Sequence, residues 1–340
     1  MIDVLFRVDF GHEIGLGHLR RSLSLATALA KWGVTSFFLT GGRSEYSAPS
    51  RFEGDVIRDV QSWTADDAKA TLEMATRRGS KTIVVDSHEV GADYLAELRA
   101  GGLFVIARDD LASYPFPCQM VINGNANARE LPYCSSSGDT RFLLGPEYAV
   151  LPPEFWEMFT RAIRDEARNV LIILGGADPC NLTPGLLALL NEMPGDFTVT
   201  AVVGPFFRNQ EEVRTAADRS QRFVKLVDGL DSVCDLMLEA DVAISAAGQT
   251  LYELICVGCP TVAIQVAPNQ EGQLKALAEA GCVRTAGSAE EGNILLRVRE
   301  ALLLLLSNPT IRATMTTMGQ RLVDGRGAER VAQAIRAAVQ

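Results

Sequence analysis

A short stretch near the amino terminus carries the residues whose types and spacing are best suited to chemistry. An apolar run, residues 4–8, is typical of a buried strand, and the pattern that begins at Leu19 is typical of an amphipathic helix. The turn between them contains Gly15 and Gly17, which let the backbone approach a ligand closely, and it ends in His18. His18 falls in the first helical turn, where the helix dipole disfavours an imidazolium. We therefore expect a neutral imidazole that can act as a general base.

Two nucleotide-binding motifs are the main alternatives for this turn, and both fit poorly. In a dinucleotide fingerprint the third glycine would fall at Arg20, and no acidic residue closes the next apolar run, residues 37–41. A phosphate-binding P-loop is disfavoured because no Gly-Lys-Ser/Thr follows. We therefore expect neither NAD nor ATP. We also expect no other cofactor and no metal ion, because the pair Cys256 and Cys259 has no second Cys or His pair near it in sequence. On the turn alone, a histidine that only caps and packs the helix stays open as an alternative.

Bulk composition narrows the class of protein. A chain of 340 residues exceeds what one core usually supports, so two domains are the default. The net charge of −10 argues against nucleic acid and anionic membranes as partners, and no obligate protein partner is evident. Seven scattered cysteines, an odd number, suit a reducing cytosol better than a disulfide framework. The first residues lack a signal-peptide pattern, so we expect a cytoplasmic protein.

Strand and helix patterns alternate along the whole chain, which predicts α/β domains with parallel sheets. Four strands of the first half end in polar residues, namely Asp9, Asp86, Asp109 and Asn123. Ligands of parallel sheets bind at the carboxyl ends of the strands, so these residues are candidates for a site. The alternative is that the acids only cap the helices that follow them. The other elements predicted for this half span residues 36–39, 56–60, 65–78, 82–86, 92–99, 103–107 and 120–123.

A proline-rich segment with little periodicity, residues 142–153, predicts a linker between two domains, 1–148 and 149–340. A helix over residues 154–167 is expected to open the second domain. The second half then repeats the order of the first, with a buried strand, a glycine turn and a helix. This similarity predicts twin Rossmann-like domains facing a cleft. The further elements predicted here span residues 169–174, 198–203, 223–226, 230–239, 241–245 and 261–265.

A second candidate site lies at the run Gly248-Gln249-Thr250, where small residues lead from a strand into a helix. Exposed amides at such a helix start can hold a phosphate. Glu253, one turn further in, can accept hydrogen bonds from ribose hydroxyls. The alternative is an ordinary strand–helix junction with a solvated glutamate. A polar loop with Asn269 and Gln270 follows the next buried strand at the same edge of the sheet, and it favours the site.

Together these residues resemble the GT-B nucleotide-sugar enzymes related to the MurG glycosyltransferase and, within that group, the pseudaminic acid pathway hydrolases of the PseG type. The resemblance covers nearly the whole chain. Its more specific part is the Gly-x-Gly-His start with two aspartate strand ends, because the carboxyl-half motif is shared across the superfamily. The residues that carry it are Arg7, Asp9, Gly15, Gly17, His18, Asp86, Asp109, Asp110, Asn123, Asn125, Gly175, Gly176, Asp178, Ser245, Gly248, Thr250, Glu253, Pro268, Asn269, Gln270 and the run 322–330.

The resemblance implies a GT-B fold and a hydrolase that cleaves a nucleotide-linked amino sugar to free sugar and UDP in nonulosonic (pseudaminic-type) acid biosynthesis. His18 would take a proton from the water that attacks the anomeric carbon with inversion. Asp9 or Asp86 would orient the sugar or the imidazole, and both stay open. UDP is a good leaving group once amides meet its charge, so no strong acid is needed. The implied substrate-binding residues are Arg7, Gly15, Gly17, Arg20, Asp109 and Asn125 in the amino domain, which would hold the sugar, and Gly175, Gly176, Gly248, Gln249, Thr250, Glu253, Asn269 and Gln270 in the carboxyl domain, which would hold UDP.

The chain departs from the family pattern in one place. The family usually follows the first aspartate with His-Tyr, whereas this chain reads Asp86-Ser87-His88. These residues lie near the sugar in the family, so the departure bears on the identity of the sugar more than on the chemistry. The main alternative function is a GT-B glycosyltransferase that passes sugar from a UDP-sugar to an acceptor, although no apolar and basic membrane-docking segment is evident. A third alternative is a non-catalytic protein that binds a nucleotide sugar, and the presence of His18 disfavours it.

Overall fold

The computed structural model describes residues 3–10, 16–41, 54–57 and 60–339. The chain forms two compact units, Met1–Pro153 together with Gly325–Gln340, and Glu154–Asp324. The expected division placed every residue from 149 onward in the second domain. The last helix instead packs on the first unit, so the chain ends in the unit in which it began.

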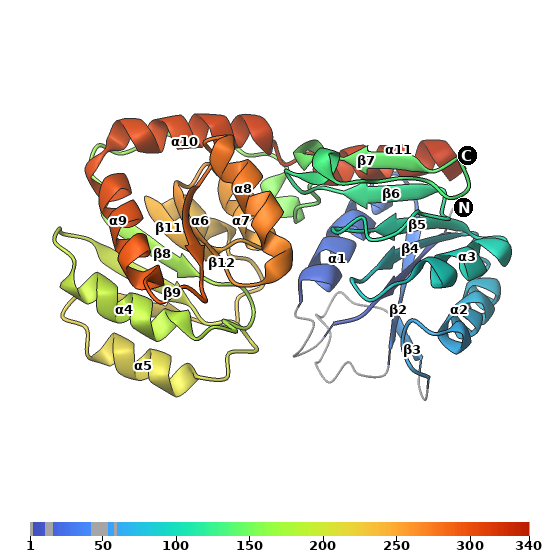
Figure 1. The fold of residues 1–340 in the computed structure, drawn as a ribbon, viewed down its shortest axis with the longest axis horizontal. Coiled ribbons are helices and arrows are strands. Elements are labelled where there is room, and N and C mark those ends of the chain that lie inside the picture. The colour runs from blue at the N-terminus through green and yellow to red at the C-terminus, as the bar shows by residue number, and fades with distance from the viewer. Residues whose placement is uncertain (1–2, 11–15, 42–53, 58–59, 340) are drawn as a thin grey trace. The chain divides into compact units, whose positions relative to one another are not determined.

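The first unit is built on a parallel sheet with seven strands among the described residues, in the order β3-β2-β1-β4-β5-β6-β7 (Figure 1). The chain builds outward from β1 to β3 and then restarts with β4 on the other side of β1. The strand order therefore reverses between β1 and β4, and Asp9 and Asp86 stand at the carboxyl ends of these two strands. The strands are β1 (Asp3–Val8), β2 (Thr35–Gly41), β3 (Gly54–Ile57), β4 (Thr82–Asp86), β5 (Phe104–Arg108), β6 (Met120–Asn123) and β7 (Arg141–Leu144), the last lying in the segment expected to be a linker.

Helix α1 (Gly17–Ala30) begins at the turn that the sequence analysis singled out. Its buried face includes His18, Arg21, Leu25 and Ala28, a spacing of three to four residues that keeps them on one side of the helix. The same amphipathic pattern that packs the helix on the sheet therefore carries His18 and Arg21 inward. The other crossover helices, α2 (Ala65–Arg78) and α3 (Ala92–Ala100), follow the predicted spans closely.

Helix α11 (Gly327–Val339) explains why the end of the chain belongs to the first unit. Gly327 packs so closely that a Cβ there would lie 2.0 Å from the carbonyl oxygen of Ala149. Arg330 donates to the carbonyl of Glu147 at 3.0 Å, and Lys31 Nζ lies 3.1 Å from Glu329 Oε1. An inner face of small and apolar residues then packs against α1. These contacts could not be predicted from sequence patterns, because the partners lie nearly 200 to 300 residues apart in the chain.

The second unit contains a parallel sheet with six strands among its described residues, in the order β10-β9-β8-β11-β12-β13. Its strand order reverses between β8 and β11. The strands are β8 (Asn169–Ile173), β9 (Thr198–Val202), β10 (Val224–Val227), β11 (Val242–Ala246), β12 (Thr261–Gln265) and β13 (Arg284–Ser288). The helices are α4 (Leu182–Glu192), α5 (Gln210–Asp218), α6 (Cys234–Glu239), α7 (Gln249–Cys256), α8 (Glu271–Glu279), α9 (Ile294–Ser307) and α10 (Pro309–Leu322).

Residues 154–167 do not form the expected helix and run mostly as an irregular segment. Their backbone groups bond to side chains from another element of the same unit. Gln320 donates to the carbonyl of Phe159 and accepts from the amide of Arg161, and Arg312 donates to two further carbonyls. These bonds satisfy polar groups that a helix would have paired internally, so the prediction of a helix here was wrong.

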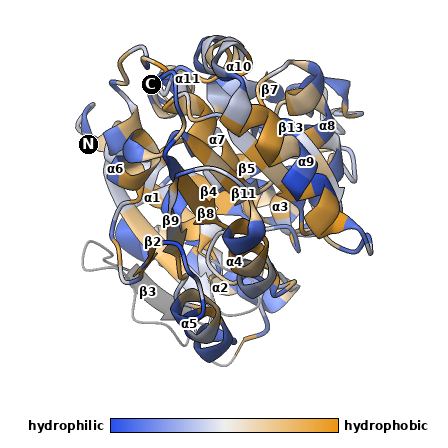
Figure 2. Ribbon diagram, turned by 90° about the vertical axis from the view of Figure 1, so that its left-hand side faces the viewer, coloured by the Kyte–Doolittle hydropathy of each residue, from blue (hydrophilic) through white to orange (hydrophobic). Residues whose placement is uncertain are grey.

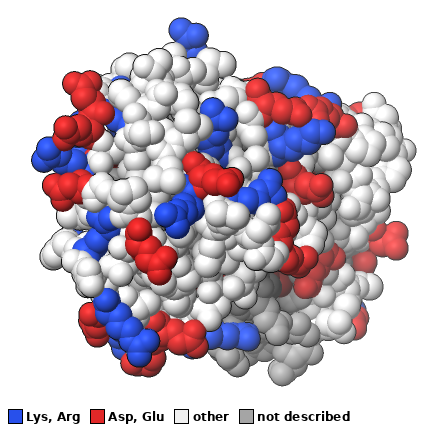
Figure 3. Space-filling model, turned by 60° about the vertical axis from the view of Figure 1, so that its left-hand side comes forward, with Lys and Arg blue, Asp and Glu red and all other residues white. Residues whose placement is uncertain are grey.

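Both cores are formed by apolar strands and by the inner faces of the helices. In Figure 2 strands such as β4, β5, β8 and β11 are hydrophobic, whereas α5 is largely hydrophilic and buries only Val213. The face drawn in Figure 3 mixes acidic and basic side chains rather than gathering one sign into a continuous patch. Because the described part of this face has no patch of one charge that would mark a site, we looked for candidate sites among the polar groups at the strand ends.

Candidate functional site

His18 and Asp86 meet where the strand order of the first sheet reverses. Asp86 is the last residue of β4 and lies in register with Val8 at the end of β1. His18 Nδ1 lies 2.6 Å from Asp86 Oδ1. Asp86, an ionised carboxylate, can only accept from Nδ1, whereas Arg21 Nη2, 3.0 Å from the same nitrogen, can only donate to it. The charged acceptor at the shorter distance favours the proton on Nδ1, which leaves Nε2 as the acceptor nitrogen. A general base needs this tautomer.

Arg21 connects this pair to a second carboxylate. Its Nε donates to Asp86 Oδ2 at 2.7 Å, and its Nη1 donates to Asp110 Oδ2 at 3.0 Å. Asp86 Oδ2 also has the hydroxyl of Ser22 at 3.3 Å. Asp86 therefore has partners on both oxygens, which holds it in one orientation against the imidazole of His18.

A second histidine stands beside the first. His88 Nε2 lies 3.0 Å from Asp110 Oδ2, and Asn125 donates to the other oxygen of Asp110 at 3.2 Å. The rings of His18 and His88 are edge-on, with centroids 4.7 Å apart and an interplanar angle of 76°. The displaced histidine of the Asp-Ser-His run thus packs directly on the candidate base.

The two histidines sit in environments that shift their pKa values in opposite directions. Burial lowers the pKa of His18, and the positive charge of Arg21 lowers it further, although Asp86 opposes both. The hydrogen bond to Asp110 raises the pKa of His88. Burial opposes ionisation of Asp86 and Asp110, but Arg21 outweighs it and holds the pKa of each carboxyl well below its usual range. Opposed shifts in one cluster are typical of acid–base sites.

Arg108 adds a third cation at the end of β5. Its Nε lies 3.7 Å from Asp86 Oδ2, and its side chain is 4% exposed. Within the described part of the chain, its buried Nε and Nη1 have no hydrogen-bond partner. Burial lowers the pKa of Arg108 to about 10, and the nearby charge of Arg21 contributes. A guanidinium so poorly solvated depends on the charges of Asp86 and Asp110 for compensation.

Asp9 belongs to a different cluster. The fully buried Arg7 forms ion pairs with Asp9 and with Asp67, and its guanidinium lies 4.2 Å from the ring centroid of Trp63. Asp9 Oδ1 also accepts from the amide of Gly41 at 2.7 Å. The sequence did not decide whether Asp9 or Asp86 contacts His18. The structure places Asp86 beside His18, whereas Asp9 bonds to Arg7 and to the backbone at the end of β2.

The other predicted residues of the first unit are dispersed. Gly15 lies outside the described residues, and Gly17 is the exposed first residue of α1. Arg20 is exposed, unlike its buried neighbours on the helix. Asp109 accepts from the amides of the two residues at 111 and 112 and from the hydroxyl of Tyr133 at 2.7 Å, so it stabilises its own loop.

The reversal point of the second sheet carries a glycine turn, and its carboxylate, Asp178, bonds to backbone amides rather than to other ionised side chains. Gly175 has a left-handed φ of +85°, which favours glycine. The carbonyl of Gly176 accepts from the amide of Phe206 at 2.9 Å, and a Cβ on Gly204 would lie 2.3 Å from that carbonyl oxygen. Asp178 accepts from two amides at the start of α4, both at 2.9 Å. The predicted glycine turn is therefore closely packed and capped.

Helix α7 begins on the neighbouring strand end. Gly248 is its N-cap and provides no side-chain cap, and among the described residues a Cβ there would have only Gln270 Nε2 within 4 Å, at 3.7 Å. The half-buried Gln249 and Thr250 form the first turn. Gln270 accepts from the amide of Val266 at 2.9 Å and Asn269 is exposed. The arrangement leaves room for an anion at the helix start.

Glu253 is 5% exposed, so it is not the solvated glutamate of the structural alternative. Gln273 contacts the residues on either side of the start of α7. It donates to the carbonyl of Ala247 at 2.7 Å and its Oε1 lies 3.0 Å from the hydroxyl of Tyr252. Gln273, which the sequence analysis did not single out, therefore holds the turn that precedes α7. No sequence signal marks it, because its role depends on a contact 26 residues away.

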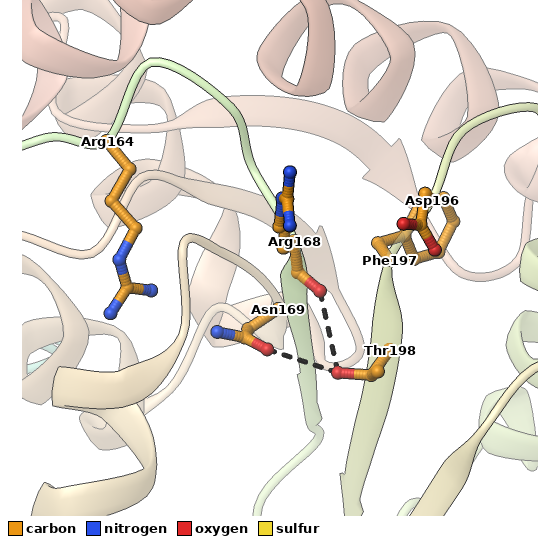
Figure 4. Close-up of a pocket in the computed structure, with 6 residues that line it drawn as sticks. All are labelled: Arg164, Arg168, Asn169, Asp196, Phe197 and Thr198. Carbon is orange, nitrogen blue, oxygen red and sulfur yellow. Dashed lines mark hydrogen bonds between the residues drawn. The ribbon is translucent and has the colours of Figure 1, made fainter.

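A shallow pocket in the second unit lies at the opposite edge of the sheet, where β8 and β9 begin (Figure 4). Its cations are already neutralised, because Arg164 pairs with Asp241 and Arg168 pairs with Glu166. Ligands of parallel sheets bind at the carboxyl ends of the strands, so this pocket is not the candidate site.

The sequence analysis missed Arg21, and it gave no role to Asp110 or Arg108. Each of these residues had a signal nearby in the sequence. Arg21 follows His18 by three residues on the buried face of the helix, and Arg108 and Asp110 come directly after a predicted strand. Within the described residues, no group of three His, Cys, Asp or Glu side chains is placed to hold a metal ion, and none of the helices is long and apolar enough to cross a membrane.

Comparison with known proteins gives a consistent set of relatives, although no family model matches. The spore coat polysaccharide biosynthesis protein SpsG of Bacillus subtilis is 26% identical over 334 residues, 95% of this chain and 94% of that protein. The UDP-2,4-diacetamido-2,4,6-trideoxy-beta-L-altropyranose hydrolase of Campylobacter jejuni is 22% identical, over 82% of this chain and 97% of that protein. An uncharacterized protein of Methanocaldococcus jannaschii is 26% identical over 75% of this chain, and the match spans about half of its length (54%).

Solved structures show the fold. MurG of Acinetobacter baumannii superposes with a TM-score of 0.72 at 15% identity, over 99% of this chain and 100% of that chain. A UDP co-structure of MnaA from S. aureus superposes with a TM-score of 0.66 at 11% identity, over 100% of this chain and 97% of that chain. With two parallel, helix-flanked sheets and these superpositions, the chain has the GT-B fold, and in sequence it is similar to the UDP-2,4-diacetamido-2,4,6-trideoxy-beta-L-altropyranose hydrolase of Campylobacter jejuni.

Proposed function

We propose that this protein is a hydrolase of a nucleotide-linked amino sugar, releasing UDP, in nonulosonic (pseudaminic-type) acid biosynthesis. At the coarser level it is an enzyme of the glycosyltransferase-like GT-B type that acts on nucleotide sugars, a level supported by its likeness to the Campylobacter hydrolase and to MurG. The observation that supports general-base chemistry is the contact of 2.6 Å between His18 Nδ1 and Asp86, because it leaves Nε2 as an acceptor at the end of a sheet where ligands bind. The likeness to the Campylobacter hydrolase favours water as the group that the base activates.

In the proposed reaction, water attacks the anomeric carbon of the sugar. The oxygen of the water forms a bond to that carbon, and its proton passes to His18 Nε2. The bond between the anomeric carbon and the phosphate oxygen breaks, and its electron pair leaves with UDP. Asp86 stabilises the imidazolium that forms, and it holds the ring in one tautomer throughout.

The second unit is proposed to bind UDP. The tight turn at Gly175 and Gly176 and the start of α7 at Gly248 stand on the adjacent strands β8 and β11, so backbone amides can share the charge of the diphosphate. Glu253 is proposed to bind the ribose hydroxyls, and Gln270 and Asn269 lie on the loop after the next strand. No metal is needed for this arrangement, because the amides meet the charge of the leaving group.

The alternative is a GT-B glycosyltransferase that passes the sugar to an acceptor hydroxyl. Its support is the structural likeness to MurG, which extends over 99% of this chain. A base such as His18 would activate an acceptor as readily as water, so the geometry of the pair does not separate the two reactions.

The test is to incubate the protein with UDP-sugars, without acceptor, in ¹⁸O-labelled water. The proposal expects stoichiometric release of UDP and free sugar, with the label on the sugar. Label in UDP would contradict attack at carbon, and turnover only after addition of an acceptor would establish the transferase instead. His18→Ala serves as the control for contaminating phosphatases, which would cleave equally in both preparations.

A further inference from the structure

Two histidine–carboxylate pairs stand side by side in the first unit, and the proposed function uses only one. His18 contacts Asp86 at 2.6 Å, and His88 contacts Asp110 at 3.0 Å. Arg21 donates to both carboxylates and links the pairs. The ring centroids lie 4.7 Å apart, so any ligand that reaches one imidazole also approaches the other.

We propose that the two pairs act as one unit in which His18 is the neutral base and His88 stays protonated and donates a hydrogen bond to an acceptor oxygen of the sugar. The contact with the sugar rests on the proposed function. The division of protons between the two histidines rests on the geometry of the first unit alone.

The charges that surround the rings favour this division. Asp86 and Asp110 supply two negative charges, and Arg21 and Arg108 supply two positive charges that balance them. One added proton is best placed on His88, because it gains the direct contact with Asp110. With His88 protonated, the cluster already carries a net charge of +1. A second proton, on His18 Nε2, would raise it to +2 and place an imidazolium beside Arg21, whose Nη2 lies 3.0 Å from His18 Nδ1.

Solvent exposure favours the same division. The side chain of His88 is 36% exposed, whereas that of His18 is 11% exposed. An imidazolium keeps more of its hydration at the more exposed position, and the buried ring loses it. The charged groups that face the two rings come from α1 (Arg21), the end of β4 (Asp86), the end of β5 (Arg108) and the loop after it (Asp110).

The separation of the rings limits what His88 can do. Inverting hydrolysis places its acid and base about 6.5–9.5 Å apart on opposite faces of the sugar. At 4.7 Å from the ring of His18, His88 lies on the side of the attacking water, so it is not the acid that protonates the leaving group. With Nε2 on Asp110, its Nδ1–H remains to donate to the sugar.

The titration of the histidines tests the division of protons directly. The chain has three histidines, so ring-labelled protein gives three resonances in NMR spectra, which the variants His12→Gln, His18→Gln and His88→Gln assign. We expect His88 to titrate above its ordinary pKa of 6.5 and His18 below it. Asp110→Asn should move the midpoint of His88 down. A His88 that titrates at or below 6.5 in the intact protein would overturn the proposal.

Kinetics test the contact with the sugar. The rate kcat/KM should fall at low pH as His18 gains a proton and at high pH as His88 loses one. His88→Gln should remove the alkaline limb, lower kcat/KM by about 10- to 100-fold at the optimum and move the acid limb to higher pH, because a positive charge beside His18 is lost. Glu89→Gln, which removes an exposed charge next in sequence, is the matched control and should leave both limbs in place.

The outcomes separate this proposal from the proposed function. An alkaline limb that survives in folded His88→Gln, with unchanged KM, would overturn the contact between His88 and the sugar. Failure of every UDP-sugar to turn over would instead overturn the hydrolase, and the NMR titration would still decide which histidine carries the proton.

Discussion

At the reversal point of the first sheet, between β1 and β4, the strand ends carry ionisable side chains that bond to one another. At the reversal point of the second sheet, between β8 and β11, the strand ends carry glycines and the uncapped start of a helix. The first arrangement holds His18, Asp86 and Arg21 in fixed contact, and the second leaves backbone amides to meet a ligand.

Under the proposed function, this difference would let one topology support two kinds of chemistry. Proton transfer needs side chains whose pKa values the surroundings have shifted, and burial among opposite charges provides the shift. Binding of a phosphate needs donors that do not titrate and a backbone that a ligand can approach, and glycine provides both. If the two reversal points act separately, a change at one should leave the function of the other intact.

The largest effect is expected for His18→Ala. Loss of the proposed base should lower turnover by about 10²–10⁴-fold, the usual contribution of one positioned proton acceptor. Affinity for UDP should stay unchanged, because the nucleotide is assigned to the other unit. Stopped assays for turnover and calorimetry for UDP, on one preparation of known melting temperature, check both. A variant that melts early but keeps full turnover when folded would leave His18 with a structural role only.

Asp86→Asn and Asp9→Asn form a matched pair, since each removes a buried carboxylate that is bound to arginine. Both should destabilise the fold, by about 3–5 kcal/mol for a broken buried ion pair. Only Asp86→Asn should lower kcat, by roughly 10–100-fold, because only Asp86 orients the imidazole. It should also move the acid limb of the pH profile to lower pH, because Asp86 raises the pKa of His18. Equal kinetic losses in both variants, measured well below their melting temperatures, would argue that the two clusters act together.

Glu253→Gln probes the second reversal point. If Glu253 binds the ribose, the loss of a charged acceptor should weaken UDP binding by about 1–3 kcal/mol. The pH dependence of kcat should not change, since no titrating group of the first unit is altered. Calorimetry with UDP measures the loss, and Glu279→Gln on the exposed end of α8 is the control. Unchanged affinity would place Glu253 outside the nucleotide site.

The smallest effect is expected for Gly248→Ala. In the part of the chain that the structure describes, its Cβ would contact only Gln270, at 3.7 Å, so the fold should be retained. UDP affinity should fall only a few-fold, because a methyl group would partly cover the helix start. Gly204→Ala is the contrast, because its Cβ would stand 2.3 Å from the carbonyl oxygen of Gly176 and should cost about 1–3 kcal/mol of stability. Thermal unfolding of both variants tests this. If Gly248→Ala lost as much stability as Gly204→Ala, the helix start would be closed rather than open.

The sequence by itself determined the alternation of strands and helices and the glycine turn at Gly175 and Gly176. The sequence predicted α2 at residues 65–78 and β4 at residues 82–86 with the bounds that the structure has. Strand β4 is a short β-branched run that is buried at every residue, and α2 is a charged helical stretch with Thr64 as its N-cap and Gly79 as its C-cap. The position of His18 in the first turn of α1 followed from the same local pattern.

Only the tertiary structure decided which partners these residues have. Asp9 and Asp86 both end apolar strands and look alike in sequence, yet Asp9 pairs with Arg7 and Asp86 pairs with His18. The second histidine pair, the return of α11 to the first unit and the irregular segment 154–167 depend on contacts between residues far apart in the chain. The physical reason is that hydrophobic period and turn propensity act over a few residues, whereas burial and ion pairing act between strands that the fold brings together.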